Sequence, residues 1–305
     1  MKNEITWPEE GLYPDIDPEL YFSLNNAPIE SRAVSKSLLW KFGSNPRRWR
    51  DSPPFVGTDS TRWGSLIDSL TLTPNRFKTS YVVQPDTYMS TGTKKDSQEV
   101  EKPWNWNSNT CKKWREDLPK GVECISTYEF KEACKARDIL LKNKFFDAMM
   151  DGGKTQVGMS LDFCGLNVTG MIDVLPSLSG AYGDSIVDLK TTASFDSPDD
   201  LSKLIDKFGY AVQAALYLDI YNSLTGEGRT KFYFAFQERK APYEVAVIEL
   251  SAGSIIAGRN WYLSAIEEWN QMLQTGVFKS PWDEINVATT PKWSKLRHEK
   301  HGYSA

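Results

Sequence analysis

The stretch GDSIVDLKTT, residues 183–192, places an aspartate and a lysine two positions apart at the end of a short apolar run. Side chains alternate between the two faces of a β-strand, so Asp188 and Lys190 should project to the same side. Opposite charges on one face of a buried strand are costly unless they are paired. The spacing therefore indicates a salt bridge, a pair at a strand edge or a catalytic site.

A second aspartate, Asp173, ends the apolar segment VTGMIDVLP fifteen residues before Asp188. A turn rich in Pro, Ser and Gly separates the two segments, so we expect a hairpin that brings Asp173 beside Asp188 and Lys190. Two neighbouring carboxylates repel each other unless a cation lies between them, and oxygen ligands of this kind favour Mg²⁺ or Mn²⁺. The sequence thus predicts a divalent-metal site at one end of a sheet.

The first half of the chain has mainly helical periodicity. We expect helices over 35–44, 60–72 and 126–150. In the second of these, Trp63, Leu66, Ile67 and Leu70 keep the spacing of one buried face. Residues 86–110 are polar and rich in turn formers, which predicts a long loop.

The pattern changes to strands after Val157. Strands are expected within 156–176 and 183–192, and a hairpin within 230–251. Between them, Ser197 and Pro198 begin one helix whose apolar stripe is predicted to run from Leu201 to Leu216. A last amphipathic helix covers 254–276.

Three polar side chains of the helix that begins at Ser197 fall outside its apolar stripe, namely Tyr210, Gln213 and Tyr217. They form a second face of the helix. That face either contacts solvent or lines a cleft beside the strand that carries Asp188 and Lys190.

Length and composition indicate an ordinary globular protein. A chain of 305 residues that is 40% hydrophobic can bury one full-sized core. We expect an irregular N-terminal arm over 1–30, a single domain over 31–288 and a polar tail over 289–305. The chain has no apolar run of the roughly 20 residues that a membrane helix needs, and its acidic N-terminus is unlike a signal peptide, so a cytoplasmic protein without membrane contact is expected.

Several kinds of site chemistry are disfavoured by the sequence. The cysteines lack close C-x-x-C spacing, which argues against an iron–sulfur cluster and favours free thiols at Cys111, Cys124, Cys134 and Cys164. Both histidines, His298 and His301, lie in the polar tail, so a Ser-His-Asp or Cys-His mechanism is not expected. The segment Gly153-Lys154-Thr155 resembles the end of a phosphate-binding loop, but Ala148 replaces the first glycine of that motif, so no nucleotide cofactor is expected.

Net charge does not identify the partner. The formal charge of −4 argues weakly against an extended basic surface, although a confined basic channel can exist in an acidic protein. Two short basic clusters with interleaved tryptophans are candidates for DNA contact or are simply solvated faces; they contain Arg47, Arg48, Lys112 and Lys113. Thr191 and Thr192, which directly follow Lys190, are further candidates for DNA contact.

The pattern of Asp173 with Asp188-x-Lys190 is that of the PD-(D/E)XK nuclease superfamily. Within that superfamily the chain resembles the RecE-type exonuclease VIII of phage recombination systems. The resemblance rests on the segments VSKSLLWKFGSNPRRWR, RWGSLIDSLTLTPNRF, GMIDVL with IVDLKTT, and FGYAVQAALYLDIY with FAFQERKAPYEVAVIEL. It implies an α+β fold of the restriction-endonuclease-like type, with a central mixed sheet flanked by helices.

The resemblance also implies roles for individual residues. Asp173 and Asp188 would be metal ligands together with the backbone carbonyl of Leu189, and Lys190 would orient or activate the attacking water. Gln213 and Tyr217 would form the wall of the active site and hold the DNA end.

Two positions depart from the family pattern. Asp68 stands where the family has a metal-binding histidine, and Gln156 is the best match to an expected glutamate. If both residues face the metal, the formal charge of the site is unchanged and the ligand set consists of oxygen alone. We therefore expect Asp68 to be a ligand that favours Mg²⁺ or Mn²⁺, with a helix-surface carboxylate as the alternative.

The implied activity is metal-dependent digestion of one strand of linear duplex DNA, in the 5′→3′ direction. The family analogy adds a ring-shaped homo-oligomer and a single-strand annealing protein as partner. The alternatives are a PD-(D/E)XK endonuclease, a nuclease of the CRISPR-adaptation type, and a catalytically inactive relative that binds DNA.

Overall fold

The computed structural model describes residues 9–14, 16, 21, 29, 32–53, 57–90, 99–163 and 165–289. Cys164, His298 and His301 lie outside the described residues, as does nearly all of the expected tail. The described cysteines Cys111, Cys124 and Cys134 are free thiols, as expected.

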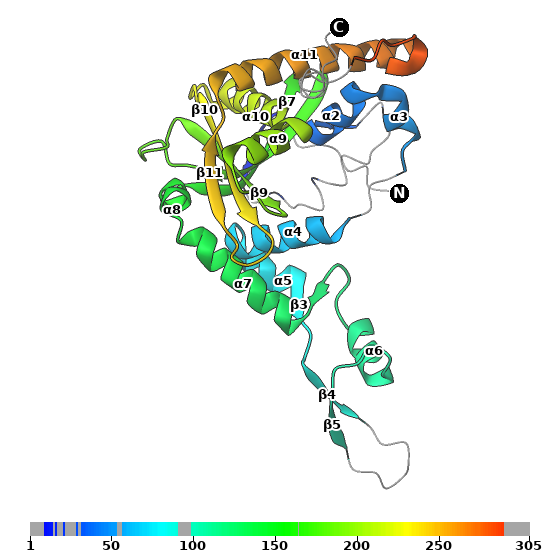
Figure 1. Ribbon diagram of the computed structural model, residues 1–305, viewed down its shortest axis with the longest axis vertical. Coiled ribbons are helices and arrows are strands. Elements are labelled where there is room, and N and C mark those ends of the chain that lie inside the picture. Colours follow the sequence, from blue (N-terminus) through cyan, green and yellow to red (C-terminus); the bar gives the residue numbers. More distant parts are fainter. Residues whose placement is uncertain are drawn as a thin grey trace, which may run out of the picture.

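A mixed β-sheet forms the centre of the protein (Figure 1). The strands follow the order β1-β7-β8-β9-β10-β11, and β2 also pairs with β8. The pairs β9–β10 and β2–β8 are parallel, and the other neighbouring strands are antiparallel. The strands are β1 (Gly11–Pro14), β2 (Val34–Ser35), β7 (Lys154–Phe163), β8 (Leu166–Leu175), β9 (Ser185–Thr192), β10 (Lys231–Glu238) and β11 (Val245–Glu249).

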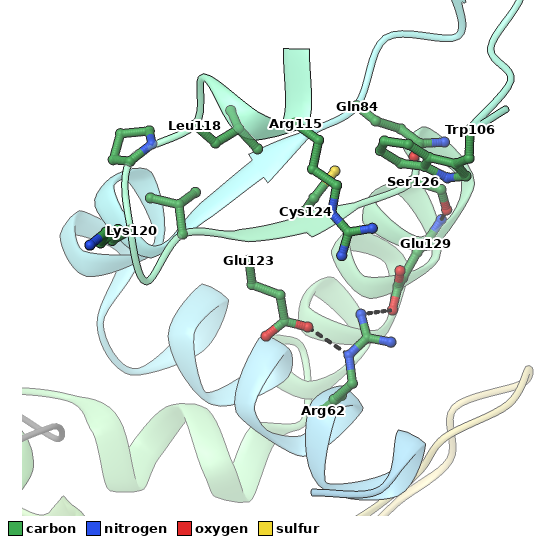
Figure 2. A pocket seen from close by; sticks show the side chains of 12 residues that line it. Arg62, Gln84, Trp106, Arg115, Leu118, Lys120, Glu123, Cys124, Ser126 and Glu129 are labelled. Atoms are coloured by element: carbon green, nitrogen blue, oxygen red, sulfur yellow. Dashed lines mark hydrogen bonds and ion pairs between the residues drawn. The ribbon is translucent and has the colours of Figure 1, made fainter. Parts of the chain in front are cut away.

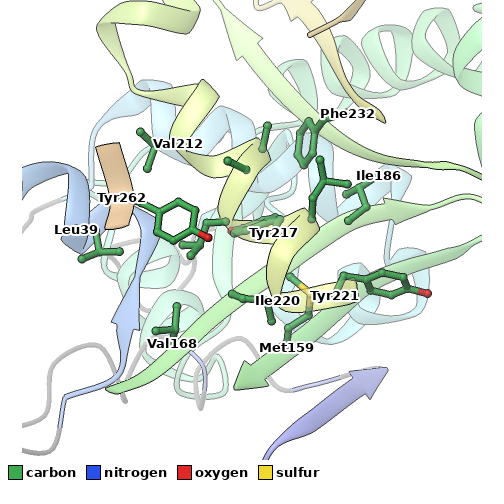
Figure 3. Close-up of a cluster of buried hydrophobic side chains, with 14 of the residues drawn as sticks. Leu39, Met159, Val168, Ile186, Val212, Tyr217, Ile220, Tyr221, Phe232 and Tyr262 are labelled. Carbon is green, nitrogen blue, oxygen red and sulfur yellow. The ribbon is translucent and has the colours of Figure 1, made fainter. Parts of the chain in front are cut away.

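Helices cover both faces of this sheet and give three layers. One face packs against α2 (Lys36–Ser44), α9 (Pro198–Lys207), α10 (Tyr210–Thr225) and α11 (Ala252–Thr275). The other face packs against α4 (Asp59–Thr71), α7 (Thr127–Leu141) and α8 (Lys144–Met150). Strand alternation divides the core accordingly, because Ile186 belongs to the first cluster (Figure 3) and Val187 to the second. The predicted α+β fold with a helix-flanked mixed sheet is confirmed.

Most predicted elements are present because their end signals are strong. The Ser35 hydroxyl accepts a hydrogen bond from the Leu38 N–H and begins α2, and Ser197 does the same for Asp200 in α9. The predicted strands and the β10–β11 hairpin also form where their periodicity placed them.

The prediction of one continuous helix after Ser197 was wrong. The chain forms two helices that are separated by Phe208 and Gly209, and Gly209 has a φ of 61°. A Cβ atom at this position would lie 2.5 Å from the ring of Trp40, so the break also allows α2 to approach closely. The apolar stripe continues across the break because both helices pack on the same core.

The long loop predicted over 86–110 was also wrong in part. Strands β4 (Thr87–Ser90) and β5 (Val100–Pro103) form an antiparallel pair, and α6 (Asn109–Glu116) follows. Together they project from the body of the protein at the side of α5 (Pro74–Ser80), β3 (Tyr81–Val83) and β6 (Glu123–Ile125) (Figure 1). Trp104 packs its ring against Trp106 and Trp114, which supplies the projection with a small aromatic core of its own.

The expected irregular N-terminal arm was wrong for one segment. Residues Gly11–Pro14 form β1 at the edge of the sheet and pair with Val157–Ser160 of β7. Their pairing extends the sheet by one strand, which local periodicity over only four residues did not indicate. No helix in the described part of the chain has the length and apolar character that crossing a membrane requires.

The close packing of α10 on α11 depends on one glycine. A Cβ atom on Gly258 would lie 2.1 Å from the backbone oxygen of Ala211, so the two helix backbones meet at this point. By contrast, a Cβ on Gly253, in the same helix, would have nothing within 4 Å.

Gly258→Ala should therefore destabilise the protein by about 1–3 kcal/mol, because the added methyl group must push the two helices apart. The matched variant Gly253→Ala should change stability by less than about 1 kcal/mol, in the favourable direction, because alanine has the higher helix propensity. Urea unfolding of both variants measures the difference, and equal stabilities would contradict this account of the helix contact.

Candidate active site

The strands β8 and β9 separate at the place where the predicted charged residues lie. They share a single bridged pair, Val174 with Val187. The antiparallel register then puts Asp173 across from Asp188. Beyond this pair, a side chain takes the place of backbone hydrogen bonds between β8 and β9, because Asp173 Oδ2 accepts a hydrogen bond from the Leu189 N–H at 2.9 Å.

A local distortion of β7 and β8 accompanies this separation. Gln156 has a φ of 51°, in the left-handed region, and its flanking residues pair with Val174 and Ile172. Ile172 packs in the core on the α10 side, whereas Val174 packs in the core on the α4 side. The normal alternation of β8 is therefore interrupted at Asp173, which explains how its carboxylate reaches the backbone of β9.

Gln156 lies directly beside this carboxylate. Its Nε2 donates a hydrogen bond to Asp173 Oδ1 at 2.9 Å. A glutamate here would place a fourth carboxylate in the cluster, whereas the amide supplies a donor. Gln156 thus supports Asp173 directly.

Asp188 is the most deeply buried charged group of the site, at 2% exposure. Its Oδ1 accepts a hydrogen bond from Gln213 Nε2 of α10 at 2.5 Å. Its Oδ2 forms an ion pair with Lys190 and has no other partner within the described part of the chain. The predicted shared face of Asp188 and Lys190 and the predicted proximity of Gln213 are thus features of the structure.

Asp68, on α4, is the third carboxylate. Burial raises its pKa to about 7; Lys190 acts in the opposite direction, and Asp188 adds to the rise. Burial also raises the pKa of Asp173, and the charges of Asp188 and Asp68 add to that rise. Three acidic side chains therefore act on one another at the end of β8 and β9.

Lys190 remains protonated in this surrounding. Burial lowers its pKa, but the negative charge of Asp188 and the neighbouring Tyr210 outweigh that effect, so the net shift of the pKa is upward. A lysine with a raised pKa is a hydrogen-bond donor and a fixed positive charge at neutral pH, and it is a poor proton acceptor.

Tyr217 takes a more internal position than the resemblance implied. It is 7% exposed, packs on Gly170, and belongs to the apolar core beneath the site (Figure 3). Burial raises its pKa well above the ordinary value. Its place in the core favours support of the site from below over contact with a DNA end.

Sequence reasoning missed one charged residue of the site, Lys36. Its Nζ donates to the Phe208 carbonyl at 2.5 Å and lies 5.1 Å from the centre of the Tyr210 ring, the same distance as Lys190 Nζ. Burial lowers the pKa of Lys36 to about 7, and Lys190 adds to the fall. The signal available in the sequence was a lysine directly after the N-cap of a helix with a buried apolar face.

The donor set fits a hard divalent cation. Two of the three carboxylates, Asp68 and Asp173, have raised pKa values, and one oxygen of the third, Asp188, is held only by Lys190. A cation between the three carboxylates would stabilise their negative charges. Leu189 directs its N–H towards Asp173, and the carbonyl of a strand residue points the same way as its N–H. Within the described residues, however, no three acidic, histidine or cysteine side chains form a ready ligand set, so an ion would have to displace Lys190 from Asp188.

The basic clusters are not part of this site. Arg47 and Arg48 lie on α3 (Pro46–Asp51), near one end of the molecule, and Arg47 pairs with Asp283. Lys112 and Lys113 lie on α6, in the projection at the opposite end (Figure 1). Thr191 and Thr192 are half-buried on β9 directly after Lys190, so they are the candidates for DNA contact that the fold places beside the cluster.

A large cavity is separate from the cluster. It has a volume of about 840 Å³ and lies between α4, β6, α7 and the start of the projection (Figure 2). Arg62 crosses its floor and pairs with Glu123 and Glu129. None of the three aspartates lines it, so cavity size alone does not identify the functional site.

Comparison with known proteins agrees with this fold. Residues 48–287 match the PDDEXK-like domain of unknown function DUF3799. A crystal structure of a candidate exonuclease from Eubacterium rectale superposes with a TM-score of 0.55 at 16% identity, covering 92% of this chain and 98% of that chain. The sequence comparison with curated proteins gives no significant match.

Two further structures resemble the chain more weakly and support no conclusion. Rai1 of Candida albicans, in complex with pU5 and Mn²⁺, has a TM-score of 0.26 at 11% identity over 87% of this chain and 77% of that chain. Rai1 of Scheffersomyces stipitis has a TM-score of 0.25 at 12% identity over 85% and 68%.

The fold and the arrangement of aspartates with a lysine define a domain of the PD-(D/E)XK nuclease superfamily. The match covers more than half of the chain, and the protein belongs to the PDDEXK-like family DUF3799.

The raised pKa of Asp68 makes stability depend on pH. The folded protein retains the proton up to about pH 7, whereas the unfolded chain loses it near 3.8, so this group stabilises the fold less as the pH rises from about 4 to 7. In chelator, Asp68→Asn should therefore gain stability relative to the wild type between pH 5 and pH 7, by on the order of 1 kcal/mol or a few degrees of Tm.

Thermal unfolding across this pH range measures the difference between the two proteins. Lys36 has the opposite effect on the pH dependence of stability, but only above about pH 7, because its pKa is lowered from 10.5 to about 7. A constant difference between wild type and variant from pH 5 to pH 7 would show that Asp68 is not held in a site that disfavours its charge.

Proposed function

We propose that the protein is a divalent-metal-dependent exodeoxyribonuclease that degrades one strand of linear double-stranded DNA. The observation that carries this proposal is the buried Asp188 carboxylate, which is held by Lys190 and Gln213 across from Asp173 and close to Asp68. Hydrolysis of a phosphodiester builds negative charge on the phosphoryl oxygens. The cluster has carboxylates that would bind a metal ion and a positively charged lysine, and such a reaction needs both.

Asp173, Asp188, the Leu189 carbonyl and Asp68 would hold one or two Mg²⁺ or Mn²⁺ ions. Such an ion stabilises the developing negative charge and lowers the pKa of a bound water. Gln213 orients Asp188 from α10, and Gln156 orients Asp173 from β7, so each principal ligand has its own supporting amide.

Lys190 would position the attacking water as a hydrogen-bond donor. Its raised pKa argues against a role as proton acceptor at neutral pH. With Asp188 serving as a metal ligand, the Lys190 ammonium group would be available to donate to the water or to a phosphate oxygen. Lys36, whose Nζ lies as close to the Tyr210 ring as that of Lys190, would be a second donor near the scissile phosphate.

Digestion from an end and 5′→3′ polarity rest on the resemblance to RecE-type exonuclease VIII, carried by the segments around residues 35–50, 63–77, 170–192 and 208–250. The same resemblance supports a role in phage-type homologous recombination in the cytoplasm of a bacterial host, a ring-shaped homo-oligomer around DNA and a single-strand annealing protein as partner. The second candidate function is a PD-(D/E)XK endonuclease, because the same cluster would cleave within a strand if the DNA path were open.

Lys190→Ala should lower the rate of linear-duplex digestion by at least about 100-fold, because the water and the transition-state charge lose their cation. Lys231→Ala is the matched control, since this half-exposed lysine lies at the start of the neighbouring strand β10. Both variants and the wild type are assayed on linear and on circular duplex with Mg²⁺ and with chelator.

Each result of this assay has one meaning. Loss of linear DNA alone supports the exonuclease, and cut or nicked circles support the endonuclease instead. DNA binding without metal-dependent cleavage by the wild type would show an inactive relative and would refute the proposed activity.

Asp68→Ala should weaken the binding of Mn²⁺ by about tenfold and slow cleavage at limiting metal, if Asp68 replaces a histidine ligand. Calorimetric titration with Mn²⁺ measures the affinity, and Asp59→Ala at the exposed start of the same helix is the control. Unchanged affinity and cleavage in Asp68→Ala would leave this carboxylate without a role at the metal.

A further inference from the structure

A second cavity lies at the end of the strand that carries the catalytic lysine. It has a volume of about 650 Å³ and is formed by Trp63 of α4, by the segment after β9 and by the β10–β11 turn. Its lining residues are Trp63, Ala193, Ser194, Glu238, Arg239, Lys240, Ala241 and Pro242. A cavity of this size accommodates a nucleotide unit of a single strand and is too small for a duplex.

Two buried donors in this cavity lack an acceptor. Trp63 Nε1 and Arg239 Nε are both inaccessible to solvent and make no hydrogen bond within the described residues. Arg239 is nevertheless fixed in place, because its Nη1 donates to the Ser60 hydroxyl and its backbone N–H donates to the Thr192 carbonyl at 2.9 Å. Because neither nitrogen has accessible surface, a ligand in the cavity would contact other atoms of Arg239 and Trp63, and a phosphate oxygen is a suitable acceptor for a guanidinium group.

The charge of the lining also favours an anion. Arg239 and the exposed Lys240 outweigh the one acidic side chain, Glu238. Glu238 is 9% exposed, and its Oε1 accepts the Phe195 N–H at 3.3 Å, which holds the segment after β9 against the turn. The carboxylate thus has a structural partner, and the two cationic side chains remain available.

An aromatic ring completes the cavity. The Trp63 ring stacks at 6.2 Å on Tyr243, with an angle of 14° between the ring planes. Its position is therefore fixed by the protein. A rigid indole beside a basic pair is the combination with which proteins bind single-stranded nucleic acid, where bases stack on rings and phosphates contact Arg and Lys.

The cavity is close to the aspartate cluster along two elements. Ser194, just after β9, follows Lys190 by four residues, a span of at most about 13 Å for extended chain. On α4, Trp63 precedes Asp68 by five residues, about 7.5 Å along the helix axis. A few nucleotides cover this distance, since consecutive nucleotides of a strand are about 3.4 Å apart along a duplex and farther apart when unstacked.

We propose that the cavity lined by Trp63, Arg239 and Lys240 binds one nucleotide of the DNA substrate, a few nucleotides away from the bond that is cut. Arg239 and Lys240 contact the phosphate, and Trp63 contacts the base or sugar. This inference rests on the proposed nuclease function and adds to it a second point of attachment for the strand. The pocket thereby determines which phosphodiester bond of the DNA strand lies beside Lys190.

The test removes the charge of single phosphates in the DNA and, separately, the charge of Arg239 or Lys240 in the protein. Duplexes that carry a single methylphosphonate linkage at successive positions near the end are compared for binding in Ca²⁺ and for single-turnover cleavage in Mg²⁺. With the wild type, one position a few nucleotides from the first cleaved bond should weaken binding by about tenfold. Arg239→Gln and Lys240→Gln should remove this sensitivity, whereas Lys231→Gln, at the far end of β10, should keep it.

One further variant, Arg239→Lys, and the Lys240→Gln variant named above guard against loss of the fold. Arg239→Lys keeps the charge, and Lys240→Gln changes an exposed side chain, so both should remain folded. The salt dependence of binding should fall by about one unit of slope for Lys240→Gln.

The outcomes separate this inference from the proposed function. If the wild type binds DNA with the expected sensitivity but does not cleave it, the nuclease proposal fails and the pocket stands. If the wild type cleaves DNA, and its binding depends on the methylphosphonate position in the same way as that of Arg239→Gln and Lys240→Gln, the proposed nucleotide pocket is refuted and the proposed nuclease activity is retained. A wild type that does not bind DNA overturns both.

Discussion

The carboxylate of Asp188, which is only 2% exposed, is the constraint to which the rest of the site responds. An unpaired charge in such a place costs several kcal/mol, so each of its oxygens requires a partner. Lys190 approaches from the same strand because residues two apart share a face, and Gln213 approaches from α10 because that helix packs on the same face of the sheet. The position of α10 therefore fixes the orientation of the carboxylate. Any change that moves this helix also moves the group on which the proposed chemistry depends.

Regular hydrogen bonding between the strands is interrupted at the site. The strands β8 and β9 keep one bridged pair, and a side-chain carboxylate occupies the place of the next backbone hydrogen bonds. The left-handed backbone of Gln156 and the interrupted alternation at Asp173 belong to the same distortion. Helices on both faces hold the strands where backbone bonding is weak. Local structure that is unfavourable by itself is commonly found where a protein has a functional site, because the surrounding core stabilises it.

The helix α4 connects the separate functional features. Its buried stripe packs on the sheet, while Asp68 approaches the aspartate cluster one turn beyond Gly64. Trp63 lines the smaller cavity, and Arg62 crosses the floor of the larger one. A Cβ on Gly64 would lie 3.3 Å from the Thr191 hydroxyl, so this helix also approaches β9 closely. One helix thus places a metal-ligand candidate, Asp68, and the ring proposed to contact a nucleotide, Trp63, beside the strand β9.

The sequence by itself determined the strands of the nuclease core, the hairpin that joins Asp173 to Asp188, and the common face of Asp188 and Lys190. Periodicity and end signals are local, so they could be read without the fold. The break at Gly209, the strand at residues 11–14 and the folded projection at 87–116 were decided by contacts with distant segments, such as Trp40 against Gly209. Lys36 and the cavity at Arg239 also became visible only in the tertiary structure. Their neighbours come from helices and turns far apart in the chain, and only the packing of the three layers brings those charges and rings together.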